Sequence, residues 1–173
     1  MIKRLDLILN GKGGVGKSFF AVNFVQYLKD KNLFHVACDC DNENSTLKRF
    51  HGEAVDFMDL SSPRALDAMF RAFEKTDLVV VDCRAASSEV FFDYFDLIDL
   101  RGTLKLLSAA LTLIIPVNHE ADSIDQLQRI EKRLALSPNG SVPGDKSFEF
   151  SQLRCRITDQ CFPKCAFNCE VVL

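Results

Sequence analysis

A glycine-rich segment near the start of the chain, residues 11–18 with the sequence GKGGVGKS, constrains the fold more than any other feature. It follows a short apolar run at residues 4–9. After it, residues 18–29 lack Gly and Pro and place apolar side chains around most of a helical circumference. A strand, a glycine loop and a helix in this order are typical of a phosphate-binding loop, whose backbone N–H groups surround an anion. The segment therefore predicts a nucleotide site in an α/β fold.

Residues of this loop have distinct expected roles. Lys17 would neutralise the β- and γ-phosphates of a nucleotide, and the Ser18 hydroxyl would hold Mg²⁺. The alternative is a glycine-rich turn with an incidental lysine. The residues expected to contact the nucleotide are Gly11, Lys12, Gly13, Gly14, Val15, Gly16, Lys17, Ser18 and Phe19.

Buried strands alternate with helices along the following chain. Apolar runs predict strands at residues 34–38, 78–81 and 111–117, and apolar periodicity predicts helices from Pro63 to Phe73 and over 122–136. Such alternation predicts a three-layer αβα fold with a mainly parallel central sheet. Residues 87–108 resist assignment, and residues 153–157 alternate like an edge strand.

Three aspartates follow the predicted strands. Asp82 ends the run at 78–81, at the sheet edge where ligands of open α/β sheets bind, and we interpret it as a Mg²⁺ partner. Asp39 and Asp41 follow the strand at 34–38 and would face the same crevice. One of them would orient the attacking water or organise the metal. For all three, the alternative is an ordinary turn aspartate.

Together these motifs resemble the deviant Walker A ATPases of the ParA/MinD family. In that family the early lysine reaches across a nucleotide-sandwich dimer to the partner's phosphates, which implies this role for Lys12. The segment at 39–46 resembles switch I, where the second aspartate, here Asp41, positions the hydrolytic water. The run ending at Asp82 matches the Walker B strand, and residues 83–88 would be switch II.

Within the family, the three motifs look most like TraL-type proteins of plasmid conjugal-transfer regions. The resemblance covers residues 3–135. It implies a slow ATPase that uses ATP and Mg²⁺, forms an ATP-dependent homodimer and acts on a partner in DNA-transfer or partition machinery. The implied catalytic residues are Lys12, Lys17 and Asp41, and the metal-binding residues are Ser18, Asp82 and Asp39. Two other functions remain open: a non-catalytic nucleotide-binding interaction module, and a small-molecule phosphotransferase.

The C-terminal part differs in character from the rest. We expect a nucleotide-binding core at residues 1–137 and a divergent Cys-rich segment at 138–173, which is either part of the same domain or a partly disordered tail. Its cysteines, Cys155, Cys161, Cys165 and Cys169, lack the C-x₂-C pair of zinc ribbons, so free thiols are favoured over a metal site. Cys38, Cys40 and Cys83 are expected to pack as small residues beside the nucleotide loops.

Charge and hydropathy limit the partners. The 173 residues include 24 acidic and 21 basic side chains, so no global positive field attracts nucleic acid or anionic lipid. DNA contact would require a local patch, and the basic pair Arg129 and Arg133 is more typical of a solvated helix face. The apolar run at 104–117 is shorter than the roughly 20 residues of a membrane span. With no secretory segment at the N-terminus, we expect a cytoplasmic protein without a membrane span.

An aromatic cluster in the unassigned segment leaves two interpretations open. Phe91, Phe92, Tyr94 and Phe95 lie close together in the sequence. They would form either an exposed surface for a partner or a contact between a helix and the sheet, and helix packing is the favoured interpretation.

Overall fold

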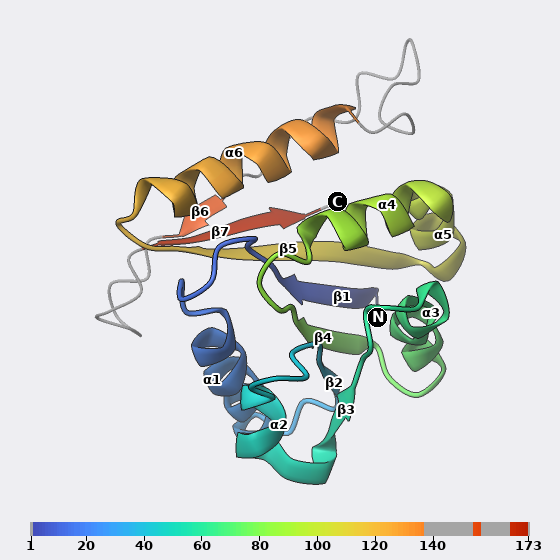
Figure 1. Ribbon diagram of the computed structural model, residues 1–173. Helices are drawn as coiled ribbons and strands as arrows, with labels where there is room; N and C mark the ends of the chain where they lie inside the picture. The colour runs from blue at the N-terminus through green and yellow to red at the C-terminus, as the bar shows by residue number, and fades with distance from the viewer. Residues whose placement is uncertain (1, 137–153, 157–166, 173) are drawn as a thin grey trace.

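The protein is built around one seven-stranded sheet with the strand order β3-β2-β4-β1-β5-β7-β6 (Figure 1). The computed structural model describes residues 2–136, 154–156 and 167–172. Its strands are β1 (Lys3–Ile8), β2 (Val36–Asp39), β3 (Val55–Phe57), β4 (Leu78–Asp82), β5 (Ala109–Val117), β6 (Arg154–Arg156) and β7 (Phe167–Val172). The pairs among β1 to β5 are all parallel, whereas β7 is antiparallel to both β5 and β6. The predicted mainly parallel sheet is confirmed.

Helices cover both faces of the sheet. The α-helices of the described residues are α1 (Lys17–Asp30), α2 (Thr46–His51), α3 (Pro63–Arg71), α4 (Ser88–Leu97), α5 (Leu100–Leu107) and α6 (Ala121–Leu136). Alternate residues of β4 belong to two separate cores: Val80 packs with residues of α1 and α2, whereas Val79 and Val81 pack with residues of α3 to α6. Because side chains alternate along a strand, these two cores lie on opposite faces. The predicted three-layer αβα architecture is therefore confirmed.

The segment that the sequence left unassigned forms α4 and α5. All four aromatic side chains of its cluster are buried in the core on the α3 to α6 face. Helix packing is thus the correct interpretation of the cluster. Between the two helices, Asp99 has a positive φ, and its side chain accepts a hydrogen bond from the Gly102 N–H at the start of α5.

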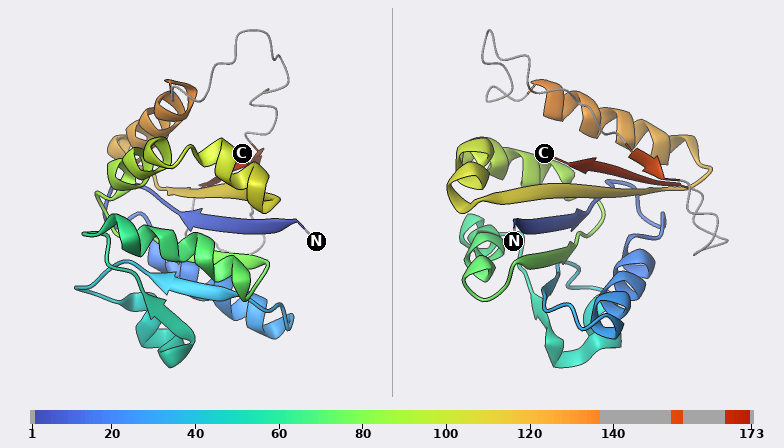
Figure 2. Two further views of the ribbon diagram at one scale, coloured as in Figure 1. Left: turned by 90° about the vertical axis from the view of Figure 1, so that its right-hand side faces the viewer. Right: turned by 180° about the vertical axis from the view of Figure 1, so that it is seen from behind.

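The described C-terminal strands extend the sheet beyond β5. The edge strand predicted at 153–157 is confirmed as β6, which pairs with β7, a strand that sequence periodicity did not predict. Figure 2 shows α6 running beside these strands. The side chains of Cys155 and Cys169 lie outside the described residues, as do Cys161 and Cys165 entirely, so the predictions for the Cys-rich segment and its boundary remain predictions.

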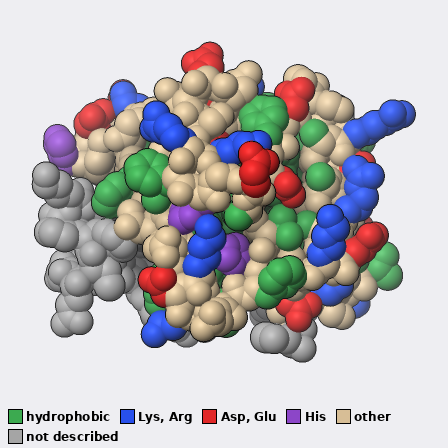
Figure 3. All heavy atoms as spheres, turned by 90° about the horizontal axis from the view of Figure 1, so that it is seen from below, with side chains coloured by type: hydrophobic (Ala, Val, Ile, Leu, Met, Phe, Trp, Pro, Cys, Tyr) green, Lys and Arg blue, Asp and Glu red, His purple; other side chains and the backbone are tan. Residues whose placement is uncertain are grey.

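Two surface properties bear on possible partners. Within the described ranges, every helix is too short or too polar to cross a lipid bilayer. On the face shown in Figure 3, Lys and Arg side chains are interspersed with Asp and Glu. This mixture agrees with the small net charge of -3.

Candidate functional site

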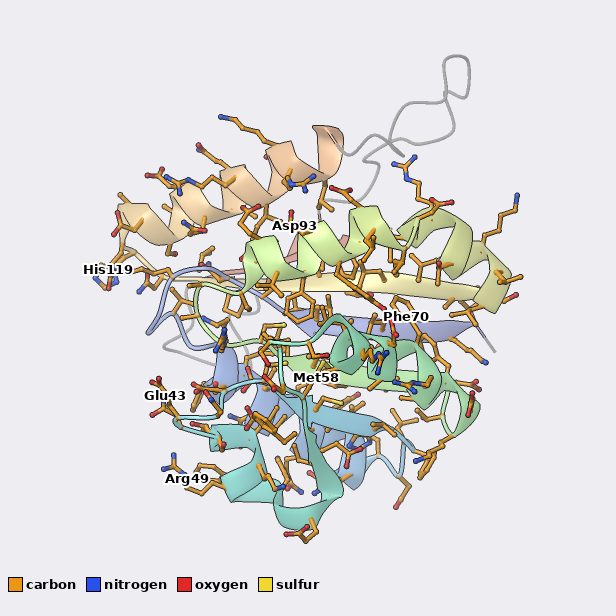
Figure 4. All side chains as sticks on the ribbon, turned by 45° about the vertical axis from the view of Figure 1, so that its right-hand side comes forward. Glu43, Arg49, Met58, Phe70, Asp93 and His119 are labelled. Carbon is orange, nitrogen blue, oxygen red and sulfur yellow. The ribbon has the colours of Figure 1, made fainter. Side chains whose placement is uncertain are left out.

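The loops that follow β1, β2 and β4 meet at the carboxyl ends of these strands. Three backbone hydrogen bonds join them: Cys40 N–H donates to Asp82 O (3.0 Å), Cys83 N–H to Ile8 O (3.1 Å) and Ala86 N–H to Gly11 O (3.0 Å). In Figure 4, Glu43 of the loop after β2 lies on the same side of the molecule as His119, which belongs to the loop after β5. The structure therefore brings together the three segments in which the sequence placed functional residues.

The glycine-rich loop adopts a conformation that requires glycine at two positions. Gly14 and Gly16 have φ angles of 76° and 97°, in the left-handed region that other residues rarely adopt. Helix α1 begins directly after Gly16. No side chain caps its N-terminus, and its first turn contains no acidic residue. The positive end of α1 is therefore available to an anion from outside the chain.

Lys17 is the first residue of α1, and among the described residues its ammonium group has one hydrogen-bond partner, which is neutral. Its Nζ donates to the backbone carbonyl of Lys12 at 2.8 Å. Within the described residues, no carboxylate forms an ion pair with it. Burial lowers the pKa of Lys17, and the nearby negative charges of Asp82 and Asp41 partly offset this effect. A phosphate would supply the charged partner that this ammonium lacks.

Asp82 is the most unusual side chain of the site. It is 1% exposed, and neither carboxylate oxygen accepts a hydrogen bond from the described part of the chain. Burial, aided by the charges of Asp39 and Asp41, raises the pKa of Asp82 to about 7, although the neighbouring Ser18 hydroxyl and Lys17 act in the opposite direction. A buried carboxylate without partners requires a proton or a cation.

The donor set around Asp82 fits Mg²⁺ bound together with a nucleotide. Mg²⁺ is usually held by one or two carboxylates plus phosphates and water. Among the described residues, no group of three or more His, Cys, Asp or Glu could hold a metal ion. A cation beside Asp82 and Ser18 would thus depend on phosphate oxygens for its remaining ligands, as expected for a nucleotide site.

Comparison with known proteins agrees with this geometry. Residues 7–153 match the CobQ/CobB/MinD/ParA nucleotide binding domain family, CbiA. The chain belongs to this family. Protein MobD of Acidithiobacillus ferrooxidans is 24% identical over an alignment of 173 positions, which covers 92% of this chain and 75% of MobD. The relationship to ParA and MinD predicted from the motifs is thus confirmed at the level of the family.

In this CobQ/CobB/MinD/ParA domain, Asp39 stands next to Asp82 but has a different environment. It is fully buried, and its two oxygens accept hydrogen bonds from the N–H groups of Asp41 (2.9 Å) and Lys48 (3.1 Å). Both bonds hold the segment between β2 and α2. The sequence predicted a metal-binding role for Asp39, and the structure places its carboxylate against the backbone.

Asp41 lies in the loop itself and is involved in a turn. Its Oδ1 accepts from the N–H groups of Glu43 (3.0 Å) and Asn44 (3.1 Å), and its Oδ2 accepts from the Asn44 side chain (3.1 Å). Partial burial raises the pKa of Asp41, but these bonds and the charge of Arg84 outweigh burial and leave the pKa below its ordinary value. Asp41 is therefore ionised at neutral pH, the state in which a carboxylate accepts hydrogen bonds.

The side chain of Lys12 extends toward the loop between β5 and α6. Its Nζ forms ion pairs with Glu120 (3.3 Å) and Asp122 (3.2 Å), and about a third of the side chain is exposed. Sequence reasoning did not single out either carboxylate. Phe19, predicted to contact the nucleotide, is 54% exposed, whereas Val15 of the same loop is buried.

Asn10 is a buried residue of the site that sequence reasoning missed. Its amide donates to Pro116 O (2.9 Å) and its Oδ1 accepts from Lys12 N–H (2.9 Å), so it joins the glycine loop to the end of β5. The available signal in the sequence was an Asn between an apolar run and the glycine loop, because a polar side chain that is buried there must find partners inside the protein.

The three described cysteines confirm their predicted packing role. Cys38, Cys40 and Cys83 are buried free thiols. Burial raises the pKa of Cys38 to about 12, and the contact with Cys83, together with burial, raises the pKa of Cys40. All three therefore belong to the class of buried, unreactive structural thiols.

Proposed function

We propose that this chain is a Mg²⁺-dependent ATP-binding and ATP-hydrolysing switch that forms a homodimer around the nucleotide. The observation that carries the proposal is the buried carboxylate of Asp82, which accepts no hydrogen bond from the described residues and lies beside Ser18 and Lys17 of a phosphate-binding loop. A buried carboxylate without hydrogen bonds from the described residues, beside an ammonium without an ion pair among them, is suited to a ligand with the complementary charges.

Each residue of the site would have one task. Lys17 would exchange the Lys12 carbonyl for phosphate oxygens, and the N–H groups of the glycine loop would bind the same anion. Ser18 and Asp82 would hold Mg²⁺, which when bound neutralises charge on the phosphates. Through its backbone contacts, Asp39 would fix the loop that carries Asp41.

Hydrolysis would depend on Asp41 and Lys12. Asp41 would orient the attacking water after its carboxylate leaves the turn with Asn44. Lys12 would reach the phosphates of the partner subunit, as the resemblance to ParA and MinD implies. Loss of the terminal phosphate would then release the loops and, with them, the dimer.

The proposed process is plasmid DNA transfer or partition, with a protein partner from that machinery. It is supported by the resemblance of the three motifs to TraL-type proteins. This part of the proposal is tested by identifying proteins that bind the chain with ATP and do not bind it with ADP.

Calorimetric titration with ATP and Mg²⁺ tests nucleotide binding. We expect Lys17→Ala to lose binding by at least tenfold, because the loop loses its only buried cation. Lys31→Ala, which removes a lysine just beyond the far end of α1, is the matched control and should bind as the wild type does. Equal binding by the wild type and Lys17→Ala would contradict the proposal.

One observation favours a second candidate, a nucleotide-binding module that does not hydrolyse ATP. All the hydrogen bonds of the Asp41 carboxylate are made to its own turn, which would leave the switch idle. Steady-state phosphate release separates the two functions. A wild-type rate that falls at least tenfold in Asp41→Ala supports the ATPase, and equal background rates support the module.

A further inference from the structure

Three sets of contacts restrain Lys12, although a role at a second subunit would require its side chain to move. Its N–H donates to Asn10, and its carbonyl accepts from Lys17. Its ammonium group forms ion pairs with Glu120 and Asp122. The side chain is thus directed at its own subunit, toward the loop between β5 and α6.

We propose that Glu120 and Asp122 are positioning residues that hold Lys12 on its own subunit, and that phosphate binding at Lys17 weakens this hold. The inference rests on the proposed function, because it concerns when Lys12 becomes available to a partner subunit. It assigns a task to two carboxylates outside the three sequence motifs.

Glu120 lies in the loop before α6 and Asp122 in the first turn of α6, and hydrogen bonds within this segment fix its conformation. Asn118 N–H donates to the Ser123 Oγ (2.9 Å), and Ser123 N–H donates to Glu120 O (3.0 Å). Asn10 donates to the carbonyl of Pro116 directly before this turn. The buried amide of Asn10 therefore fixes both the backbone of Lys12 and the end of β5, from which the segment with Glu120 and Asp122 continues.

The link to phosphate binding runs through one carbonyl group. In this structure the Lys17 ammonium bonds the Lys12 carbonyl at 2.8 Å. A phosphate that binds Lys17 competes for that ammonium and frees the carbonyl, so the peptide of Lys12 loses one of its three restraints. Binding at one lysine would thus lower the barrier to moving the other.

The strength of the ion pairs of Lys12 depends on how exposed the two carboxylates are. The side chains of Glu120 and Asp122 are 47% and 73% exposed, so each ion pair is weak. Exposed pairs of this kind are worth about twofold to fivefold in an equilibrium constant. In a symmetric dimer both copies of Lys12 must leave their carboxylates. The dimerisation constant therefore changes by the square of the factor for one Lys12.

Chemical reactivity of Lys12 tests the hold without any nucleotide. A free amine reacts with acetic anhydride faster than one held as an ammonium between two carboxylates. We expect Lys12 to be acetylated about threefold or more faster in the double variant Glu120→Gln, Asp122→Asn than in the wild type. The rate would be measured by peptide mass spectrometry. Asp125→Asn, an exposed acid on the same helix, is the control.

The outcome of this assay is decisive in either direction. Equal Lys12 rates in the double variant and the wild type would overturn the inference, whatever the protein does with ATP. If ATP drives dimerisation of the wild type, light scattering should show about tenfold tighter dimers in the double variant. Looser or unchanged dimers would also overturn it. Failure of the wild type to bind ATP would instead contradict the proposed function and leave the acetylation result standing.

Discussion

The ends of β2 and β4 differ sharply although the same residue type occupies both. Asp39 and Asp82 are register partners on adjacent parallel strands, and both are buried. Asp39 accepts two backbone hydrogen bonds, whereas Asp82 accepts none from the described residues. Of two neighbouring aspartates, one therefore supports the structure and the other lacks partners and is suited to bind a cation.

The difference arises from the path of the chain after each strand. After β2 the chain folds back, so that the N–H groups of Asp41 and Lys48 point at Asp39. After β4 it turns toward the glycine loop, where Ala86 N–H bonds to Gly11 O. The path of the chain thus decides which of the two carboxylates lacks backbone donors and is available to a cation.

The largest expected effect is a gain in stability when Asp82 is replaced. The pKa of Asp82 rises from 3.8 to about 7 on folding, so the folded chain keeps a proton that the unfolded chain has lost. Stability from this proton is complete below pH 4 and is lost as the pH rises through about 7. At pH 8 without Mg²⁺, Asp82→Asn should raise the free energy of unfolding by up to about 4 kcal/mol.

Denaturant titrations at pH 5 and pH 8 check this prediction. At pH 5 the folded wild type carries a neutral Asp82 but the unfolded chain has already lost most of this proton, so the gain from Asp82→Asn should shrink to about 2 kcal/mol. A difference that stays the same between the two pH values would show that Asp82 does not bear the buried charge.

A smaller effect of opposite sign is expected at the end of β2. Asp39→Asn replaces one acceptor oxygen by an N–H₂ group that faces a backbone donor, so one buried hydrogen bond is lost. We expect the free energy of unfolding to fall by about 1 to 3 kcal/mol. The measurement belongs at pH 5, where the neutral Asp82 does not repel Asp39. If Asp39→Asn instead raised the free energy of unfolding, Asp39 would not have the structural role that distinguishes it from Asp82.

The end of β1 offers a third position for comparison, since its polar residue is neutral. Asn10→Ala removes the amide that bonds Pro116 O and Lys12 N–H, so the buried Pro116 O and the partly buried Lys12 N–H lose this partner. Denaturant unfolding should show a loss of about 1 to 2 kcal/mol. Asn23→Ala, which removes an exposed amide on α1, is the control and should change stability by less than about 0.5 kcal/mol.

The smallest effect concerns the thiols that follow the two aspartates. Cys40 and Cys83 are buried, and the pKa of Cys40 is raised by its contact with Cys83 and by burial. A water-soluble thiol reagent should therefore leave both residues unlabelled in the folded protein and label both in denaturant. Peptide mass spectrometry resolves each site. Labelling under native conditions would show that these strand ends open to solvent.

The sequence predicted the strands and helices with strong local patterns. The apolar run at 78–81 and the glycine loop define β4 and the start of α1, because a buried parallel strand and a phosphate loop each impose their own composition. Short elements such as α2 and β3 were not predicted, since six and three residues are too few to show a hydrophobic period. Strand β7 escaped because its place depends on pairing with β5.

The candidate site was predicted less completely than the fold. The positions of Asp39, Asp41 and Asp82 after predicted strands identified all three as candidates. The sequence does not show which backbone N–H groups surround each carboxylate. The pairing of Lys12 with Glu120 and Asp122 spans more than one hundred positions in the chain, as the Lys12 to Asp122 separation of 110 shows. Such contacts arise only from the tertiary fold.

Calorimetric titration of the wild type and Asp82→Asn with ATP, with and without Mg²⁺, tests the central claim most directly. The unpartnered carboxylate of Asp82 is expected to make ATP binding at least tenfold tighter in Mg²⁺. Asp82→Asn should lose this gain and retain the weaker binding that Lys17 provides. Equal strengthening by Mg²⁺ in both proteins, or no binding by the wild type, would contradict the account.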